Sequence, residues 1–414
     1  MSLILHVADV RPIRRALIAG FAAVCILLSW GTAGRTAPAT VGKPTGAGQE
    51  LTGKITAPSA ILVEPSTGRV LWEKNADVSR PIASVVKVMT LTLVMEALDA
   101  GTIRLDDPVT ASEHVVSMGG SQIWLESGET MPVSELIKAV AIESANDAAV
   151  ALAELVAGSE ESFVSMMNEK ARSLGCTNTS FVNATGLPGA TAADDCTSSA
   201  HDVALISREL LKHSKIHEWL TVWIGYVRDG KNMLTNTNRL IRFYPGADGL
   251  KTGFTERAKY CLSATAMRNG VRVIAVVLGV PTSAVRFAEA SLLLDYGFRM
   301  CEAHTLAVAG QEIGTIRVCR GTLTSVPVSV REDVKVVTQK GSESKIEARL
   351  SLPQSVDAPV SRGQAVGRLV ATVDGEETVS VDLVASTDAP RARFATILVR
   401  STRELFRSVF IFGR

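Results

Sequence analysis

Apolar and polar positions alternate with different periods along the chain, and the change of period separates strands from helices. Two short apolar segments on either side of a turn at residues 66–69 predict a β-hairpin over residues 59–73. The expected helices cover residues 84–100, 133–156, 162–174 and 284–296, and the expected later strands cover residues 260–267 and 271–279. Strands at both ends with helices between them predict an α/β (α+β) domain in which a mixed sheet is flanked by a helical region.

Two further patterns follow Cys301. Short alternating segments separated by Gly, Asp and Pro predict a small all-β domain over residues 300–390. Residues 391–414 have helical spacing and contain six arginines and one glutamate. Their apolar face gathers Phe394, Leu398, Leu405, Val409 and Phe412, opposite Arg393, Arg400, Arg403 and Arg407. This pattern favours a terminal amphipathic helix on an anionic membrane surface over a helix packed on its own domain.

The N-terminal segment has the layout of a secretory signal peptide. Three arginines between residues 11 and 15 precede an apolar run over residues 16–30, which ends in small residues. The run is shorter than the roughly 20 residues of a spanning helix, so cleavage is favoured over an uncleaved anchor. We predict a signal peptide over 1–34, a flexible leader over 35–51 and the principal domain over 52–299. The protein is therefore expected to be exported and held peripherally at the outer face of the cytoplasmic membrane.

Length and charge narrow the possible functions. At 414 residues the chain exceeds the usual single core, which agrees with two domains. Its 46% hydrophobic and 21% charged residues are typical of a folded globular protein. Because 43 basic residues balance 42 acidic ones, there is no basic surplus to bind a phosphate backbone. Nucleic acid is not expected as a partner.

Cysteines and histidines form no recognisable metal or redox motif. Cys25 lies inside the predicted signal peptide, and the other five cysteines cannot all pair internally. Cys301 with Cys319 is the disulfide to test first, although buried free thiols are the simpler interpretation. His213 and His217 have metal-compatible spacing, but no glutamate completes a zinc-protease pattern. We expect neither a metal nor another cofactor.

Three short polar motifs occur in order along the principal domain. They are Ser84-Val-Val-Lys87, Ser144-Ala-Asn146 and Lys251-Thr252-Gly253. A second Ser-x-x-Lys, from Ser342 to Lys345, falls in the β-rich region, so the pattern also arises by chance. Only the first copy stands at the start of an apolar helix, and this context separates the two copies.

Ser84 and Lys87 combine a nucleophile with a base. A hydroxyl at a helix N-terminus lies in a field that favours developing negative charge. The Lys87 amine, three residues later, returns to the same face within reach of the Ser84 oxygen. The amine acts as a base near neutral pH if burial and a neighbouring cation lower its pKa, and Lys251 is the candidate cation. Taken alone, Ser84 would be a helix cap and Lys87 a solvated position.

Ser144 and Asn146 interrupt an otherwise apolar run, and polar groups in such a run need partners. If both line a cleft, Ser144 relays the proton toward the leaving amine, and Asn146 binds Lys87 or a substrate amide. The alternative is a helix break whose polar groups are satisfied by their own backbone.

Lys251, Thr252 and Gly253 follow a turn and lead into Phe254. Lys251 with Thr252 can hold a terminal carboxylate, and Gly253 on a strand edge lets a peptide approach the backbone. The backbone N–H groups of Ser84 and Phe254 would then form an oxyanion hole. A β-turn with an exposed lysine is the alternative.

Residues from about 58 to 299 resemble the serine D-alanyl-D-alanine carboxypeptidases, the low-molecular-mass penicillin-binding proteins of the peptidase S11 family. Besides the three motifs, the resemblance rests on Met118-Gly-Gly-Ser-Gln-Ile-Trp-Leu-Glu-Ser-Gly-Glu129, Phe181-Val-Asn-Ala-Thr-Gly-Leu-Pro188 and Asp248-Gly-Leu-Lys-Thr-Gly-Phe-Thr255. Many relatives have Ser-Leu-Thr-Lys at the first motif, and some have His where Phe254 stands. Neither difference removes a catalytic group.

The resemblance implies a serine β-lactamase/transpeptidase-like fold for residues 52–299 and an acyl-enzyme on Ser84. Lys87 would be the base, Ser144, Asn146 and Lys251 would be supporting groups, and Arg286 looks like the family arginine that helps to hold the substrate carboxylate. The implied partners are peptidoglycan stem peptides ending in D-Ala-D-Ala, with β-lactams as covalent inhibitors. The implied activity removes the terminal D-alanine and limits cross-linking of the cell wall. A serine β-lactamase and a catalytically inactive wall-binding module are the alternatives.

Overall fold

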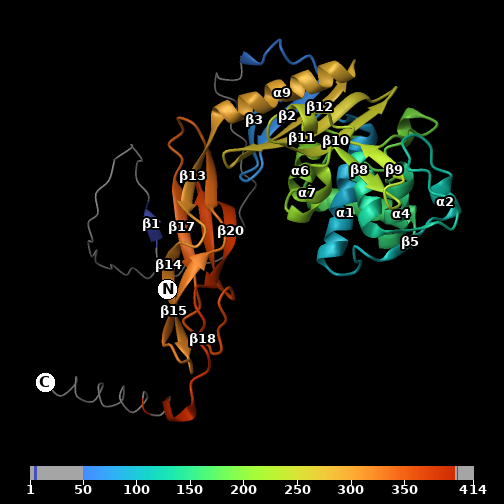
Figure 1. Cartoon of the computed structure of the whole chain (residues 1–414). Coiled ribbons are helices and arrows are strands. Elements are labelled where there is room, and N and C mark those ends of the chain that lie inside the picture. Colours follow the sequence, from blue (N-terminus) through green and yellow to red (C-terminus); the bar gives the residue numbers. More distant parts are fainter. Residues whose placement is uncertain (1–3, 7–49, 397–398, 400–414) are drawn as a thin grey trace. The chain divides into compact units, whose positions relative to one another are not determined.

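The structure is a computed structural model that describes residues 4–6, 50–396 and 399. Two compact units divide these residues, and Figure 1 traces the chain through both. The first unit holds residues 50–305 and 335–343, and the second holds residues 306–334, the described residues from 344 onward, and residues 4–6. Most of the predicted signal peptide and leader, and most of the predicted terminal helix, lie outside the described residues.

The first unit is built on a five-stranded sheet in the order β10-β11-β12-β2-β3. Every neighbouring pair is antiparallel. The strands are β2 (Ser59–Glu64), β3 (Arg69–Lys74), β10 (Ala247–Thr255), β11 (Lys259–Arg268) and β12 (Val271–Val280). The predicted hairpin and the two predicted later strands are confirmed. The central strand β12 is a run of β-branched residues, which suits a strand buried on both faces.

Helices cover both faces of this sheet. Along β2, Ile61 and Val63 belong to one hydrophobic core, while Ala60 and Leu62 belong to the other. Helix α9 (Ser283–Met300) lies on the second core, and α1 (Lys87–Asp99) and α6 (Ala200–Leu210) lie on the first (Figure 1). The sheet therefore separates two cores. Helix α1 packs in the larger core, and its first residue is Lys87 of the first polar motif.

The helical region contains a break that the apolar pattern did not reveal. One helix was predicted over residues 133–156, but α3 (Val133–Ile142) ends before Ser144, and α4 (Asn146–Ala157) begins after it. Helix α5 (Glu160–Ser173) follows as expected. The remaining elements of this region are short: β4 (Arg80–Pro81), β5 (Pro108–Thr110), α2 (Glu113–Val116), β6 (Thr130–Pro132), β7 (Thr197–Ser198), α7 (His217–Leu220), β8 (Ile224–Val227), β9 (Asn232–Thr235) and α8 (Leu240–Phe243).

The second unit is built from strands, as predicted. Its sheet has the order β1-β17-β19-β20-β15-β14-β18. The strands are β1 (Ile4–His6), β14 (Glu312–Cys319), β15 (Ser325–Val330), β17 (Ile346–Ser351), β18 (Val356–Asp357), β19 (Ala365–Val373) and β20 (Glu376–Ala385). Asp374 and Gly375, both with positive φ, make the tight turn between β19 and β20. A separate two-stranded ladder pairs β13 (Cys301–Ala307) with β16 (Val334–Gln339), and most of its residues belong to the first unit.

The suggested disulfide is wrong. Cys301 and Cys319 are free, as are the other three described cysteines. Burial raises the pKa of the Cys301 thiol to about 12, so this group stays protonated, and the thiolate needed for disulfide exchange is scarce.

Among the helices of the described residues, none is both long and apolar enough to cross a bilayer.

Candidate active site

Ser84 and Lys87 lie where a tight turn becomes a helix. Ser84 belongs to the 3-10 turn η2 (Ala83–Val86), and Lys87 is the first residue of α1. The predicted helix start at Ser84 is therefore a 3-10 turn instead of an α-helical one. With three residues per turn, side chains at i and i+3 align. The Lys87 amine accordingly lies 3.2 Å from the Ser84 hydroxyl.

The Lys87 side chain is fully buried among hydrogen-bond acceptors. Its Nζ donates to Asn146 Oδ1 at 2.6 Å and to the Thr185 carbonyl at 2.6 Å. Burial, followed by the positive charge of Lys251, holds the pKa of Lys87 well below that of a free lysine. A neutral amine has two N–H donors and one lone pair. When the amine is neutral, the two acceptors take its two N–H donors, and its lone pair is left for the Ser84 hydroxyl.

The second motif forms the connection between α3 and α4. Ser144 is buried and has a φ of 68°, a left-handed conformation that ends α3. Asn146 opens α4, and its Nδ2 donates to the Gly119 carbonyl at 2.6 Å while its Oδ1 accepts from Lys87. The prediction offered a cleft wall or a helix break, and the motif is a helix break that also brings Asn146 to Lys87.

The third motif lies on the edge strand β10. Lys251 is buried, and burial, followed by the charge of Arg286, lowers its pKa to about 7. Its Nζ donates to the Thr252 carbonyl at 3.0 Å. The Thr252 hydroxyl lies 2.7 Å from that of Thr237. An amine and a hydroxyl are therefore held on one strand, and the protonated form of that amine is close enough to lower the pKa of Lys87.

Two glycines bring main chain close to the nucleophile. A Cβ added at Gly253 would lie 3.1 Å from the Ser84 nitrogen and 2.7 Å from the Ile82 carbonyl oxygen. A Cβ at Gly186 would lie 2.1 Å from the Ala83 carbonyl oxygen and 2.9 Å from the Ser84 nitrogen. The turn that carries Ser84 is thus enclosed by backbone from two distant segments, and only glycine fits at either position.

Phe254 lies on the same strand, and Arg286 contacts that strand from α9. Phe254 is half exposed, and its ring centroid lies 4.4 Å from that of Tyr260. Arg286, buried on α9, donates from Nη1 to the carbonyls of Gly253 and Cys261 at 3.2 and 3.3 Å. Its charge also helps to lower the pKa of Lys251. Arg286 therefore donates to the Gly253 carbonyl of the third motif, and its charge favours the neutral form of Lys251.

The structure brings together residues of all three motifs and adds groups that the sequence did not single out. The most direct addition is the Thr185 carbonyl, since it accepts from Lys87. A backbone acceptor has no side-chain signature, but its segment, residues 181–188, was among those that carry the family resemblance. His213 and His217, whose spacing is compatible with a metal site, each lie near a different acidic residue. His213 contacts Asp99 at 2.5 Å, and His217 lies 3.7 Å from Asp248.

Two family models and several known proteins are similar to this chain. A family model described as D-alanyl-D-alanine carboxypeptidase matches residues 44–282, and one described as penicillin-binding protein 5, C-terminal domain, matches residues 302–391. The chain is 43% identical over 349 residues to the D-alanyl-D-alanine carboxypeptidase DacF of Bacillus subtilis, covering 83% of this chain and 89% of that protein.

Solved structures lead to the same family. A peptidoglycan synthesis regulatory factor (PBP3) from Streptococcus pneumoniae aligns with a TM-score of 0.63 and 31% identity, covering 81% of this chain and 99% of that one. Penicillin-binding protein D2 from Listeria monocytogenes in its cefotaxime-bound form aligns with a TM-score of 0.54 and 34% identity, covering 59% of this chain and 98% of that one. The chain therefore belongs to the peptidase S11 family of D-alanyl-D-alanine carboxypeptidases.

Proposed function

We propose that this protein removes the terminal D-alanine from peptidoglycan stem peptides through an acyl-enzyme on Ser84, and so limits cross-linking of the cell wall. One observation carries the assignment of roles: a fully buried lysine amine lies 3.2 Å from the Ser84 hydroxyl with two acceptors on its other side. This arrangement prepares an uncharged base at the nucleophile before substrate arrives.

In the proposed acylation step, each of these groups has one role. The Ser84 oxygen attacks the carbonyl carbon of the penultimate D-alanine while Lys87 Nζ takes the hydroxyl proton. The backbone N–H groups of Ser84 and Phe254 stabilise the oxyanion. The C–N bond then breaks, and the proton passes through Ser144 to the leaving amine of D-alanine. Lys251 and Thr252 hold the terminal carboxylate, and Arg286 supports the backbone of their strand.

Deacylation completes the cycle. Water adds to the ester carbonyl, Lys87 accepts a proton from that water, and the Ser84 oxygen leaves with a proton as the shortened peptide is released. A β-lactam would acylate the same hydroxyl, and its opened ring would remain attached. The cefotaxime-bound form of the Listeria relative supports including β-lactams as inhibitors.

The alternatives have less support. A serine β-lactamase shares the motifs, but the matching family model and the Bacillus relative are described as carboxypeptidases. An inactive wall-binding module would not need an amine buried against a serine hydroxyl.

Replacing the nucleophile tests the proposal. Ser84→Ala should abolish both D-alanine release from a pentapeptide and labelling by a fluorescent penicillin, because no other hydroxyl is activated by Lys87. Circular dichroism and the unfolding midpoint should stay near those of the wild type. Ser342→Ala, in the second Ser-x-x-Lys, serves as the matched control and should retain full activity. Labelling of the Ser84 variant would move the nucleophile elsewhere.

Export and membrane attachment form a second part of the proposal. Residues 1–34 would be removed as a signal peptide, residues 52–299 and 300–390 would form the mature domains, and residues 391–414 would bind the outer face of the cytoplasmic membrane. The opposite faces of arginines and of apolar residues predicted for the tail support this proposal. Deletion of residues 391–414 should shift the protein from the membrane pellet to the supernatant. Sedimentation with membranes at the wild-type level would contradict the anchor.

A further inference from the structure

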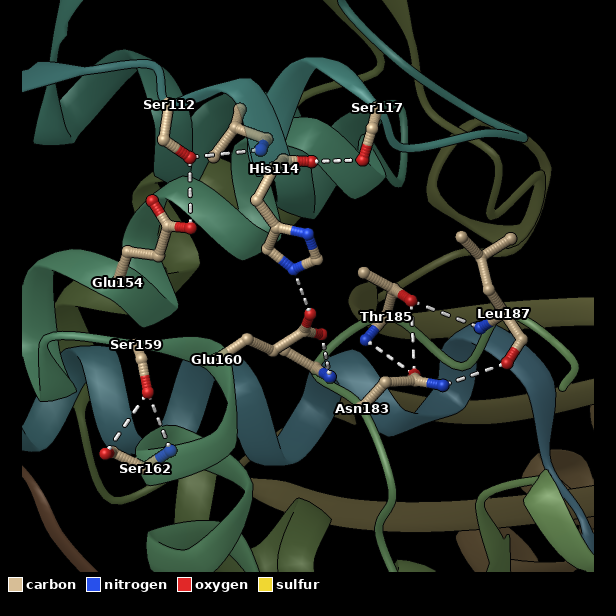
Figure 2. A network of polar contacts seen from close by, with 12 residues as sticks. Ser112, His114, Ser117, Glu154, Ser159, Glu160, Ser162, Asn183, Thr185 and Leu187 are labelled. Atoms are coloured by element: carbon tan, nitrogen blue, oxygen red, sulfur yellow. Dashed lines mark hydrogen bonds and ion pairs between the residues drawn. The ribbon is translucent and has the colours of Figure 1, made fainter.

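The Thr185 carbonyl, which accepts from Lys87, belongs to a tight turn. Contacts with other parts of the chain fix the position of this turn. Within the turn, Asn183 Oδ1 accepts from the Thr185 N–H at 3.1 Å, and Asn183 Nδ2 donates to the Leu187 carbonyl at 3.0 Å (Figure 2). Asn183 Oδ1 also accepts from the Gly186 N–H at 2.6 Å. These contacts set the shape of the turn. They do not set its distance from α1, so another restraint must bring the Thr185 carbonyl to Lys87.

Ala184 supplies that restraint, because both of its backbone polar groups are anchored to helices. Its carbonyl accepts from the Thr90 hydroxyl at 2.7 Å, and Thr90 lies on α1 one turn after Lys87. Its N–H donates to Glu160 Oε1 at 2.9 Å, and Glu160 is the first residue of α5. The peptide units on the two sides of Ala184 are thus attached to two different helices.

Glu160 is itself restrained by a second partner. Its Oε2 lies 2.7 Å from His114 Nε2, so its two carboxylate oxygens have different partners. Figure 2 shows the ring of His114 pointing to Glu160, and Glu160 pointing to the turn of Asn183 and Thr185. The Glu160 side chain is only 12% exposed, whereas that of His114 is 46% exposed. The half-exposed His114 is therefore connected to Lys87 through the Glu160 carboxylate and the turn that contains Thr185.

We propose that Glu160 is a positioning residue for Lys87. By holding the Ala184 N–H, it keeps the Thr185 carbonyl at 2.6 Å from Lys87 Nζ, and this acceptor leaves the amine lone pair directed at Ser84. His114 steadies the carboxylate. The inference rests on the role proposed above for Lys87, and it adds a residue that none of the three motifs contains.

A purely structural role for Glu160 makes a different prediction. A carboxylate in the first turn of α5 also stabilises the helix dipole, and Glu161 is a neighbouring carboxylate in the same turn. If Glu160 only stabilised the fold, its loss would reduce the fraction of active molecules and leave the acylation rate constant of the remainder unchanged. If it positions Lys87, the rate constant falls while every folded molecule still becomes labelled.

The test measures acylation by a fluorescent penicillin in single-turnover experiments on the full protein. Glu160→Ala should lower the limiting acylation rate constant about 10-fold to 100-fold, with one label per chain and a nearly unchanged half-saturating concentration. Glu160→Gln should recover most of the rate, because its amide oxygen can still accept from Ala184. Glu161→Ala is the matched control and should acylate at the wild-type rate. A wild-type rate for Glu160→Ala, or a Glu160→Gln variant as slow as Glu160→Ala, would overturn the inference.

Failure of this inference can be told from failure of the proposed function. If Lys87→Ala acylates normally, Lys87 is not the base, and the proposed mechanism is wrong whatever Glu160 does. If Lys87→Ala is inactive while Glu160→Ala is normal, only the positioning role is wrong. His114→Ala should give a smaller loss than Glu160→Ala, since it removes a restraint on the carboxylate and leaves the acceptor in place.

Discussion

The chain contains the same four-residue pattern in two places, and the two copies have different surroundings. In the first, Lys87 is fully buried, and its amine contacts Ser84, Asn146 and the Thr185 carbonyl. In the second, Ser342 and Lys345 are exposed on an irregular segment between β16 and β17. Lys345 pairs with Glu347 at 2.6 Å, and the Ser342 hydroxyl donates to the Gln339 carbonyl.

The difference shows what converts the pattern into a candidate catalytic pair. An exposed ammonium beside a carboxylate is stabilised by its partner and by water. Burial and a second positive charge shift an amine toward its uncharged form, and the acceptors around Lys87 fix the direction of its side chain. The 3-10 turn then places the serine on the same side of the chain. Burial, a neighbouring charge and turn geometry therefore carry the chemistry, and the spacing alone does not.

Replacing the lysine of each copy by alanine should give the largest difference in acylation rate between the copies. Lys87→Ala should lower acylation by about 10²-fold to 10⁴-fold, the usual contribution of a general base. Lys345→Ala should leave the rate unchanged. Fluorescent penicillin labelling over time measures both variants. Similar rates for the two variants would mean that burial does not distinguish the copies.

A smaller effect is expected on the pH dependence. Acylation requires neutral Lys87, so its rate rises with pH through the pKa of that group. The charge of Lys251 lowers this pKa, and Lys251→Met removes the charge. The pKa of Lys87 should therefore rise, and the acidic limb of the acylation profile should move to higher pH. Lys345→Met should not move the limb, and a shift to lower pH in Lys251→Met would contradict the electrostatic coupling.

The smallest expected difference is in stability. Asn146→Ala leaves the Gly119 carbonyl and one Lys87 N–H without their partner, at a cost of about 1–3 kcal/mol. Ser342→Ala removes one exposed hydroxyl contact and should change the free energy of unfolding by less than about 0.5 kcal/mol. Urea titration compares the two midpoints. Equal midpoints would show that the buried network adds little to folding.

The sequence predicted the elements with strong periodicity and the residues with distinctive side chains. The hairpin of β2 and β3, the strands β11 and β12, and the approach of Lys87 to Ser84 were all predicted. The interruption at Ser144 was offered only as an alternative, because the apolar residues on either side continue the helical spacing through it. Tertiary contacts there hold a non-glycine residue at positive φ.

Other features have no local signal at all. The Thr185 carbonyl acts through the backbone, so no residue type at that position announces its contact with Lys87. The disulfide was suggested from count and compartment, yet the described cysteines are free thiols. The number of cysteines limits how many disulfides can form, but it does not show which cysteines lie close together.

The enclosure of Ser84 by Gly186 and Gly253 restricts how evolution or an engineer can alter this enzyme. At these two positions main chain packs directly against the backbone of the turn that carries Ser84, so a side chain at either glycine would push the turn aside. Altered reactivity toward penicillins would have to arise at other positions around Ser84. Selection for drug tolerance in this chain should therefore spare Gly186 and Gly253.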